Sequence, residues 1–254
     1  MADRLKGSVV LVTGASSGIG EATARSLAAE GAKVALVARR LERLEKLAKE
    51  LAGEGHTAVA IEADITDQQQ AIRAVERTVG DFGRLDILVN NAGVMLLGPM
   101  PGAPIEEWDR MIDINLKGLL HMTHVAMPHL LAAAGDSERG VADLVNISSV
   151  AGRVASAGAG VYNMTKFGVG AMSEALRQEV SNKDVRVTII EPGAVATELT
   201  DHLRPEIRDS VRARFDDIKP LDAHDIADAI AYVVTRPAHV SVNEVLIRPT
   251  HQGR

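Results

Sequence analysis

The sequence predicts one α/β domain, a doubly wound parallel sheet of seven strands with helices on both faces. Three observations lead to this fold class. Short runs of Val, Leu, Ile and Ala alternate with longer segments in which apolar residues recur at helical spacing. The short runs are almost continuously apolar, as parallel strands are when helices cover both faces of their sheet. A glycine-rich turn follows the first run, and no Pro- or Ser-rich linker divides the 254 residues.

Strands are expected wherever such an apolar run is bounded by polar residues or glycine. In chain order the runs are "SVVLVT" (residues 8–13), "KVALVA" (33–38), "TAVAIEA" (57–63), "LDILVN" (85–90), "ADLVNIS" (142–148), "VRVTIIEP" (185–192) and "EVLIRP" (244–249). Between them, helical spacing predicts helices over residues 21–30, 41–51, 68–82, 105–131, 161–181 and 222–235. This βαβ alternation predicts a Rossmann-type sheet in a single domain, residues 1–254.

One segment, residues 193–221, interrupts this rhythm between the sixth strand and the last helix. An open α/β sheet binds its ligands at the carboxyl ends of the strands, so we expect this insertion to cover a substrate. The alternative is a solvated surface excursion. Its arginines, with Arg153, could attract a substrate carboxylate, although salt-bridged surface arginines are the favoured interpretation; they are Arg204, Arg208, Arg212 and Arg214.

Composition narrows the classes of protein. The hydrophobic content is 46%, charged residues make up 24%, and the formal net charge is −6, which argues against a nucleic-acid partner. The absence of cysteine excludes disulfides and thiolate nucleophiles. No apolar run approaches the roughly 18 residues of a membrane span, and the amino terminus does not resemble a secretory signal. We therefore expect a cytoplasmic protein with no membrane partner and no metal site.

The turn "TGASSGIG" after the first strand predicts a phosphate-binding site. Three glycines, Gly14, Gly18 and Gly20, permit a tight turn and a close approach of the backbone to a ligand, and the helix that follows presents free N–H donors. The spacing lacks the Gly-Lys-Ser/Thr ending of nucleoside triphosphatases. A tight turn without a ligand is the alternative. We expect a dinucleotide pyrophosphate here, contacted also by Ser16, Ser17 and Ile19.

The end of the second strand indicates which dinucleotide binds. Ala38 stands where an acid would hold the ribose 2′-hydroxyl of NAD, and Arg39 and Arg40 follow. An arginine there can pair with the 2′-phosphate of NADP(H). Alternatively, both arginines belong to the solvated start of the next helix. Asp64, with its neighbour Ile65, is expected beside the adenine, although Asp64 could instead be a helix N-cap.

A tyrosine and a lysine one helical turn apart, Tyr162 and Lys166, predict a proton-transfer site. Positions i and i+4 share a helix face, so the ammonium can lie near the phenol. A phenol has a reference pKa of about 10, and a nearby cation favours its ionised form. The alternative is a ring packed on the helix flank beside a surface lysine. It is disfavoured because both residues belong to one of the motifs described next.

The order of the motifs resembles the single-domain, NADP-dependent branch of the short-chain dehydrogenase/reductase family. The similarity runs from residue 6 to about residue 248 and rests on "TGASSGIG", "NNAG", "INLKG", "ISSVAG", "YNMTK" and "EPGAV". The resemblance implies that Ser149 polarises a carbonyl, Tyr162 is the acid/base, Lys166 binds cofactor and lowers the tyrosine pKa, and Asn115 supports a proton relay. Ser148 is then a structural neighbour. Further cofactor contacts implied are Asn91, Ala92, Gly93, Pro192, Gly193, Val195 and Thr197.

The function predicted in this way is interconversion of a small-molecule ketone or aldehyde and an alcohol by hydride transfer with NADP(H), as in carbonyl reductases. The resemblance also implies a homotetramer. Two alternatives stay open: an NAD-dependent alcohol or polyol dehydrogenase, and a non-catalytic regulator that senses NADP(H). The regulator needs only the glycine turn, so the intact serine, tyrosine and lysine argue against it.

Overall fold

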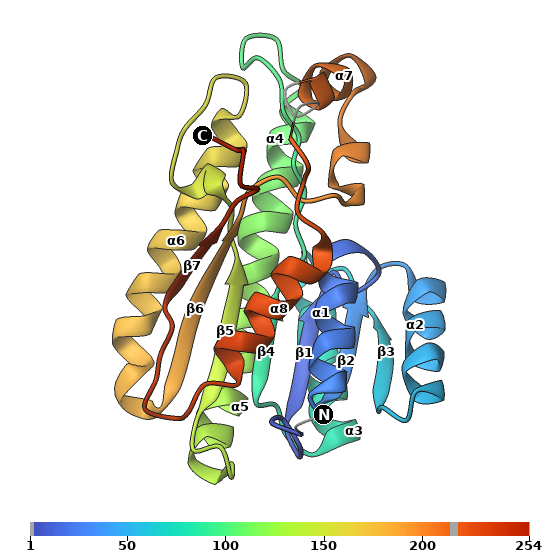
Figure 1. The fold of residues 1–254 in the computed structure, drawn as a ribbon, viewed down its shortest axis with the longest axis vertical. Helices are drawn as coiled ribbons and strands as arrows, with labels where there is room; N and C mark the ends of the chain where they lie inside the picture. Colours follow the sequence, from blue (N-terminus) through green and yellow to red (C-terminus); the bar gives the residue numbers. More distant parts are fainter. Residues whose placement is uncertain (1–2, 214–217, 254) are drawn as a thin grey trace.

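The sheet confirms the predicted fold class. The computed structural model describes residues 3–213 and 218–253, in which all neighbouring strands are parallel and follow the order β3-β2-β1-β4-β5-β6-β7 (Figure 1). The strands are β1 (Val9–Thr13), β2 (Lys33–Ala38), β3 (Ala58–Glu62), β4 (Ile87–Asn90), β5 (Ala142–Ile147), β6 (Val185–Pro192) and β7 (Glu244–Ile247). From β1 the chain adds β2 and β3 on one side of the sheet and β4 to β7 on the other. The switch point between β1 and β4 is where doubly wound sheets bind ligands.

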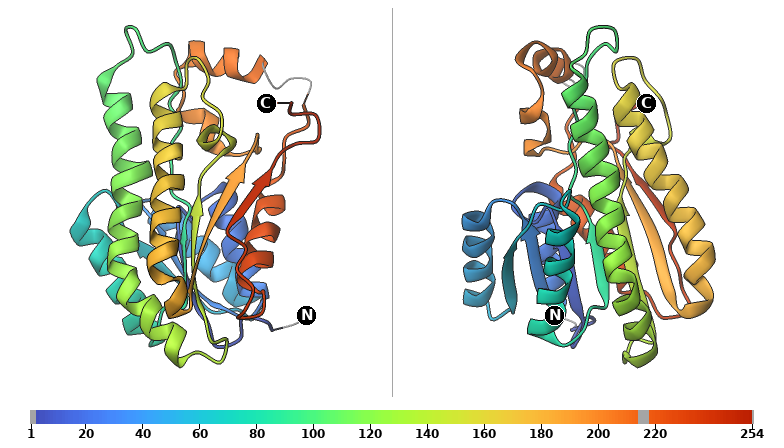
Figure 2. Two further views of the ribbon diagram at one scale, coloured as in Figure 1. Left: turned by 90° about the vertical axis from the view of Figure 1, so that its left-hand side faces the viewer. Right: turned by 180° about the vertical axis from the view of Figure 1, so that it is seen from behind.

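Helices cover both faces of the sheet. Those on one face are α1 (Gly18–Ala29), α2 (Leu41–Gly53) and α8 (Ala223–Val234); on the other lie α3 (Gln68–Phe82), α5 (Leu119–Asp136) and α6 (Gly160–Val180) (Figures 1 and 2). The remaining helices are α4 (Ile105–Ile112), α7 (Pro205–Ala213), a π-helical turn Asp113–Gly118, and 3₁₀ turns Val150–Gly152, Ser181–Lys183 and Glu198–His202.

Strand β1 shows why the apolar runs become buried strands. Every one of its residues is buried. Val10 and Val12 join the core under α1, α2 and α8, whereas Val9 and Leu11 join the core under α3, α5 and α6. Successive side chains of a strand point to opposite faces, so a strand between two helical layers needs an apolar residue at every position.

The helix expected over residues 105–131 is divided in the structure. Helix α4 ends at Ile112, the π-helical turn Asp113–Gly118 follows, and α5 continues to Asp136. A Cβ on Gly118 would lie 2.7 Å from Cγ1 of Ile65, so the chain approaches the loop after β3 closely at this turn. Apolar periodicity continues through the turn and therefore did not reveal it; π-helical turns of this kind often occur at functional sites.

The described parts of the insertion, residues 193–213 and 218–221, lie beyond the carboxyl ends of the strands. Figure 1 shows α7 next to α4 at that end of the molecule. The two elements are joined by an ion pair between Arg204 Nε and Glu107 Oε1 at 2.9 Å. Residues 214–217, and with them Arg214, lie outside the described residues.

Candidate active site

A groove with a volume of about 310 Å³ runs along the carboxyl ends of the central strands. It collects predicted residues from segments far apart in the sequence: Gly14, Ser16, Ser17, Gly18, Ile19, Arg39, Arg40, Asp64, Ile65, Asn91, Ala92, Gly93, Ser149, Tyr162, Lys166, Pro192, Gly193, Val195 and Thr197. Gly20 and Asn115 were also predicted but do not line it. The lining residues outside the predicted site are Arg110, Glu198, Leu199 and His202, together with Val37, Ala38, Ala63, Val94, Ile114, Ile147 and Ser148.

The glycine turn fits a dinucleotide. Gly14 and Gly18 have φ of +67° and +55°, a backbone conformation that favours glycine. A Cβ on Gly20 would lie 2.4 Å from the Gly14 carbonyl oxygen, so this glycine lets α1 approach the turn. The N-cap residue Ser17 makes no capping hydrogen bond, which leaves the first N–H groups of α1 available to a phosphate in the groove.

The turn is held against the end of β4 by Asn91. The Asn91 side-chain amide donates to the Thr13 carbonyl oxygen at 2.9 Å, and the Thr13 hydroxyl oxygen accepts from the backbone N–H groups of Asn91 and Ala92 at 3.0 and 3.1 Å. These bonds fix two walls of the groove relative to each other before any ligand binds.

One end of the groove carries a cluster of positive charge. The Arg40 guanidinium donates to the Ser17 hydroxyl at 2.7 Å and to the Ser16 hydroxyl at 2.9 Å, and it forms an ion pair with Glu198 at 2.8 Å. The pKa of His202 is lowered by burial and then by the nearby arginines Arg110, Arg39 and Arg40. The predicted 2′-phosphate arginines therefore face the groove, but one of them already has an acidic partner.

Asp64 lies in the groove and is not a helix cap. Its side chain accepts from the backbone N–H and the hydroxyl of Thr66, at 3.0 and 2.7 Å. The N-cap of α3 is Asp67, which accepts from the backbone N–H groups of Gln69 and Gln70. The alternative that Asp64 caps the helix is therefore wrong, because the chain makes one more turn before α3 begins.

At the other end of the groove, Ser149 follows the last residue of β5 by two positions. Its hydroxyl oxygen accepts from the Ala151 N–H at 3.1 Å, and its proton makes a long 3.4 Å contact with the Pro192 carbonyl oxygen. The same hydroxyl lowers the pKa of the Tyr162 phenol. Ser148 donates to the Lys166 carbonyl oxygen at 3.1 Å, a structural contact that secures α6 against β5.

Tyr162 and Lys166 lie side by side and are almost fully buried, at 6% and 7% exposure. Burial raises the pKa of Tyr162 to about 12, and the hydrogen bond with Ser149 opposes that rise. Burial lowers the pKa of Lys166 to about 8; its Nζ donates to the Ile147 carbonyl oxygen at 2.9 Å and lies 5.8 Å from the centre of the tyrosine ring.

These values correct the expectation that Lys166 lowers the pKa of Tyr162. In the structure the group that lowers it is Ser149, and the net shift is upward. The physical reason is burial, which favours the neutral forms of both the phenol and the amine and which the spacing of two residues on a helix does not reveal.

Asn115 occupies the π-helical turn and supports the site from outside the groove. Its Oδ1 accepts from the Val94 N–H at 2.8 Å, while its Nδ2 donates to the Val94 carbonyl oxygen at 2.9 Å and to the Thr165 hydroxyl at 3.2 Å. The side-chain amide thus ties the loop after β4 to α6.

Two further contacts could not be read from the sequence. The Gln252 side-chain oxygen accepts from the Ala194 N–H at 2.9 Å, and a Cβ on Gly193 would lie 2.3 Å from that same oxygen. Arg153 forms ion pairs with Glu191, at 2.7 Å, and with Glu244. The interpretation of Arg153 as a salt-bridged residue is the one that the structure supports.

The described parts of the chain give two results on metals and membranes. In residues 3–213 and 218–253 no three His, Asp or Glu side chains come together as metal ligands would. Within the same ranges, no helix combines the length and hydropathy of a membrane span.

A parallel sheet with a glycine turn at its switch point and a groove above its carboxyl edge defines a Rossmann-type dinucleotide-binding protein. The sequence model of the family described as short chain dehydrogenase matches residues 8–208, and the chain belongs to this family of oxidoreductases.

Similar proteins span nearly the whole chain. An uncharacterized oxidoreductase of Staphylococcus saprophyticus is 41% identical over 256 residues, which are 99% of this chain and 99% of the relative. The closed form of a serine dehydrogenase complexed with NADP+ has a TM-score of 0.85 at 35% identity, covering 97% of this chain and 96% of that one. A 3-ketoacyl-(acyl-carrier-protein) reductase from Brucella melitensis, complexed with NADH, has a TM-score of 0.83 at 31% identity, covering 96% and 98%. Several other similar structures contain NADP.

Proposed function

We propose that the protein interconverts a small-molecule ketone or aldehyde and an alcohol with NADP(H). The observation that carries this proposal is the cluster of Ser149 with the buried Tyr162 and Lys166 at one end of a groove whose other end holds Arg39 and Arg40. A bound nicotinamide would supply the hydride, so the protein has to orient the carbonyl and deliver one proton to its oxygen.

Tyr162 is the proposed proton donor. With a pKa of about 12 the phenol stays protonated at neutral pH, which is the state that carbonyl reduction requires. The Ser149 hydroxyl, weakly held by the Pro192 carbonyl oxygen, can turn its proton toward the substrate oxygen. Lys166, whose pKa burial lowers to about 8, lines the groove beside Tyr162 and is proposed to bind the cofactor there.

NADP(H) is proposed over NAD(H) because β2 ends in Ala38 and is followed by two arginines that line the groove. The serine dehydrogenase and several other similar structures bind NADP, which supports this choice. The second candidate is an NAD-dependent alcohol or polyol dehydrogenase. Glu198 favours it, since its carboxylate holds Arg40 and could accept a hydrogen bond from a 2′-hydroxyl. The NADH complex of the Brucella melitensis reductase is a similar protein with that cofactor.

The substrate is proposed to lie under the insertion 193–221, which would act as its cover. Thr197, Glu198, Leu199 and His202 line the groove from this segment. Val94 lines the groove and belongs to an apolar cluster that also contains Leu96 and Val161. From segments such as "MLLGP" and "EVLIRPT" we infer a resemblance to clavulanic acid dehydrogenase and related reductases, which we carry no further than the substrate class of ketones and aldehydes.

Activity on a panel of ketones and aldehydes tests the proposal. We expect the wild-type protein to oxidise NADPH with at least one of them, and Tyr162→Phe to lower kcat by about 10²–10⁴-fold, the usual contribution of a positioned acid. Nucleotide binding should survive, because the ring is retained. Binding without turnover in the wild type would favour a sensor of NADP(H), and full activity in the variant would refute the proton-donor role.

We also propose a cytoplasmic homo-oligomer, expected to be a tetramer. Met164 and Phe167 on α6 and Leu246 on β7 are large apolar residues with 43–50% exposure, on the elements through which the family usually assembles. Light scattering at micromolar concentration tests this, and a monomer would contradict it.

A further inference from the structure

We propose that Glu198 is a cofactor-specificity residue: its carboxylate is paired with Arg40, one of the two arginines expected to receive the 2′-phosphate, and NADP(H) must displace it. The inference rests on the proposed NADP(H) function and deepens it. Glu198 does not belong to the predicted site, and nothing in the glycine turn or at the end of β2 indicates it.

The contacts define the competition. One Glu198 oxygen lies 2.8 Å from Arg40 Nη1, and the other lies 2.7 Å from Arg43 Nη1. The two arginines hold the pKa of Glu198 down at about 2, so the carboxylate is charged at every physiological pH. The acid therefore presents a full negative charge where a phosphate dianion is expected.

Arg40 cannot serve both anions without a rearrangement. Its guanidinium already contacts the hydroxyls of Ser16 and Ser17, so it faces the glycine turn at the point where the groove begins. A phosphate that binds Arg40 beside these hydroxyls lies next to the Glu198 carboxylate. Two neighbouring anions repel each other. Glu198 has to turn away before the phosphate gains its full contact.

The position of Glu198 allows this turn and connects it to the cover of the groove. It is the first residue of the 3₁₀ turn Glu198–His202, directly after Thr197, whose methyl group packs near Gly18. Its side chain is 44% exposed, so it can rotate into solvent. With NAD(H) the ribose carries a neutral hydroxyl, and Glu198 can keep both arginines.

The test compares the Kd values of NADPH and NADH for the full-length wild type, Glu198→Gln, Arg40→Ala and a matched control by titration calorimetry. The control is Glu206→Gln, which removes the same charge from the same insertion at a residue paired with Arg204. Release of two exposed ion pairs predicts that Glu198→Gln tightens NADPH binding about three- to tenfold. NADH binding should change less than twofold, and Glu206→Gln should change neither.

The failure of this inference is distinct from failure of the proposed cofactor. If Arg40→Ala weakens NADPH selectively while Glu198→Gln leaves NADPH affinity unchanged or lowers it, the competition by Glu198 is refuted and the NADP(H) function stands. If Arg40→Ala weakens NADPH and NADH equally, the assignment of the 2′-phosphate site falls and the inference falls with it.

Discussion

At the amino ends of β5 and β6 two buried charges, Asp143 and Arg186, are paired with each other, whereas at the carboxyl end of β5 the buried ammonium of Lys166 binds a backbone carbonyl oxygen. All three side chains are less than 10% exposed. The difference lies in how each charge is neutralised. Pairing preserves the charged state of a buried group, and burial without an opposite charge shifts its pKa toward neutrality.

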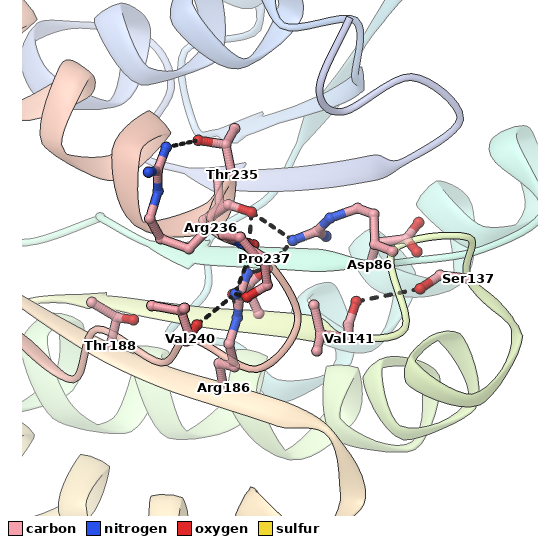
Figure 3. A network of polar contacts seen from close by, with 12 residues as sticks. Asp86, Ser137, Val141, Arg186, Thr188, Thr235, Arg236, Pro237 and Val240 are labelled. Carbon is pink, nitrogen blue, oxygen red and sulfur yellow. Dashed lines mark hydrogen bonds and ion pairs between the residues drawn. The ribbon is translucent and has the colours of Figure 1, made fainter.

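The amino end is a closed network (Figure 3). Arg186 meets both oxygens of Asp143, at 2.7 and 3.0 Å, and its remaining N–H groups donate to backbone carbonyl oxygens, including Val234 at the end of α8 and Val240 beyond it. Arg139 adds a second ion pair to Asp143. This network joins β5, β6 and the segment after α8, and all three guanidinium nitrogens of Arg186 donate within it, whereas Nη1 of Arg139 is buried without a partner among the described residues.

The carboxyl end keeps its polar groups available. Lys166 has its pKa lowered to about 8 and Tyr162 has its pKa raised to about 12, each mainly by burial. Groups held away from their ordinary pKa values in a groove are the ones that can exchange protons with a substrate. The same sheet thus separates charges that stabilise the fold from charges that can carry out chemistry.

The largest expected effect is a loss of stability when the ion-pair network at the amino ends of β5 and β6 is broken. Arg186→Met leaves Asp143 buried with one partner fewer and removes the donors to four backbone carbonyl oxygens, so we expect the free energy of unfolding to fall by about 3–5 kcal/mol. Urea unfolding followed by circular dichroism measures this. Arg177→Met, at an exposed pair with Glu174, should change stability by less than about 1 kcal/mol. Equal losses in the two variants would contradict the comparison.

At the carboxyl end, removing the buried charge is expected to raise the free energy of unfolding rather than lower it. Lys166 has a folded-state pKa of about 8 and an unfolded value of 10.5, so between these pH values the unfolded state binds more protons and stability rises with pH. At pH 7 the charged, buried amine costs about 3 kcal/mol, of which a lost hydrogen bond to Ile147 would offset about 1. Lys166→Met should therefore raise the free energy of unfolding by about 1–2 kcal/mol while reducing turnover.

Unfolding at several pH values checks this prediction. The advantage of Lys166→Met should shrink from pH 8 to 9.5, a range below the ionisation of tyrosine in the unfolded chain. A variant less stable than the wild type at pH 7 would show that the ammonium stabilises the fold, as the charges of the amino end do.

The smallest effect concerns the wall of the groove. Gln252→Leu removes the acceptor for the Ala194 N–H, and one hydrogen bond of this kind predicts a two- to tenfold rise in KM for the nucleotide, or about 0.5–1.5 kcal/mol, with little change in kcat. Gln252→Glu keeps an acceptor at the same distance and should restore KM. If Gln252→Leu and Gln252→Glu have the same KM for the nucleotide, residue 252 has no positioning role.

The sequence was sufficient for the strands and for most of the groove. Continuous apolar runs such as "VVLVT" have one stable location, between two helical layers, and the glycine turn follows directly after one of them. The motif order assigned Ser149, Tyr162 and Lys166, and the structure brings all three into the groove. The strands and the glycine turn were predictable because each depends on a local pattern, and the three side chains were assigned from the resemblance of the motifs to a known family.

Several features could not be predicted because they depend on contacts between distant segments. The pair of Arg40 and Glu198 joins residues 158 positions apart, and the bond from Ala194 to Gln252 joins residues 58 apart. The π-helical turn at Asn115 leaves the apolar pattern unchanged. The direction of the Tyr162 pKa shift was mistaken for the same reason, since burial is a property of the folded environment.

The amino-acid sequence by itself therefore determined the order of strands and helices and the place of the glycine turn, because hydrophobic periodicity and backbone freedom act locally, while the proton-transfer residues stay a prediction from the resemblance of the motifs. Only the tertiary structure decided which buried charges are paired, which are shifted in pKa, and that an acid faces the arginines of the groove. Electrostatic free energies depend on distance and desolvation, and both are fixed only when the chain has folded.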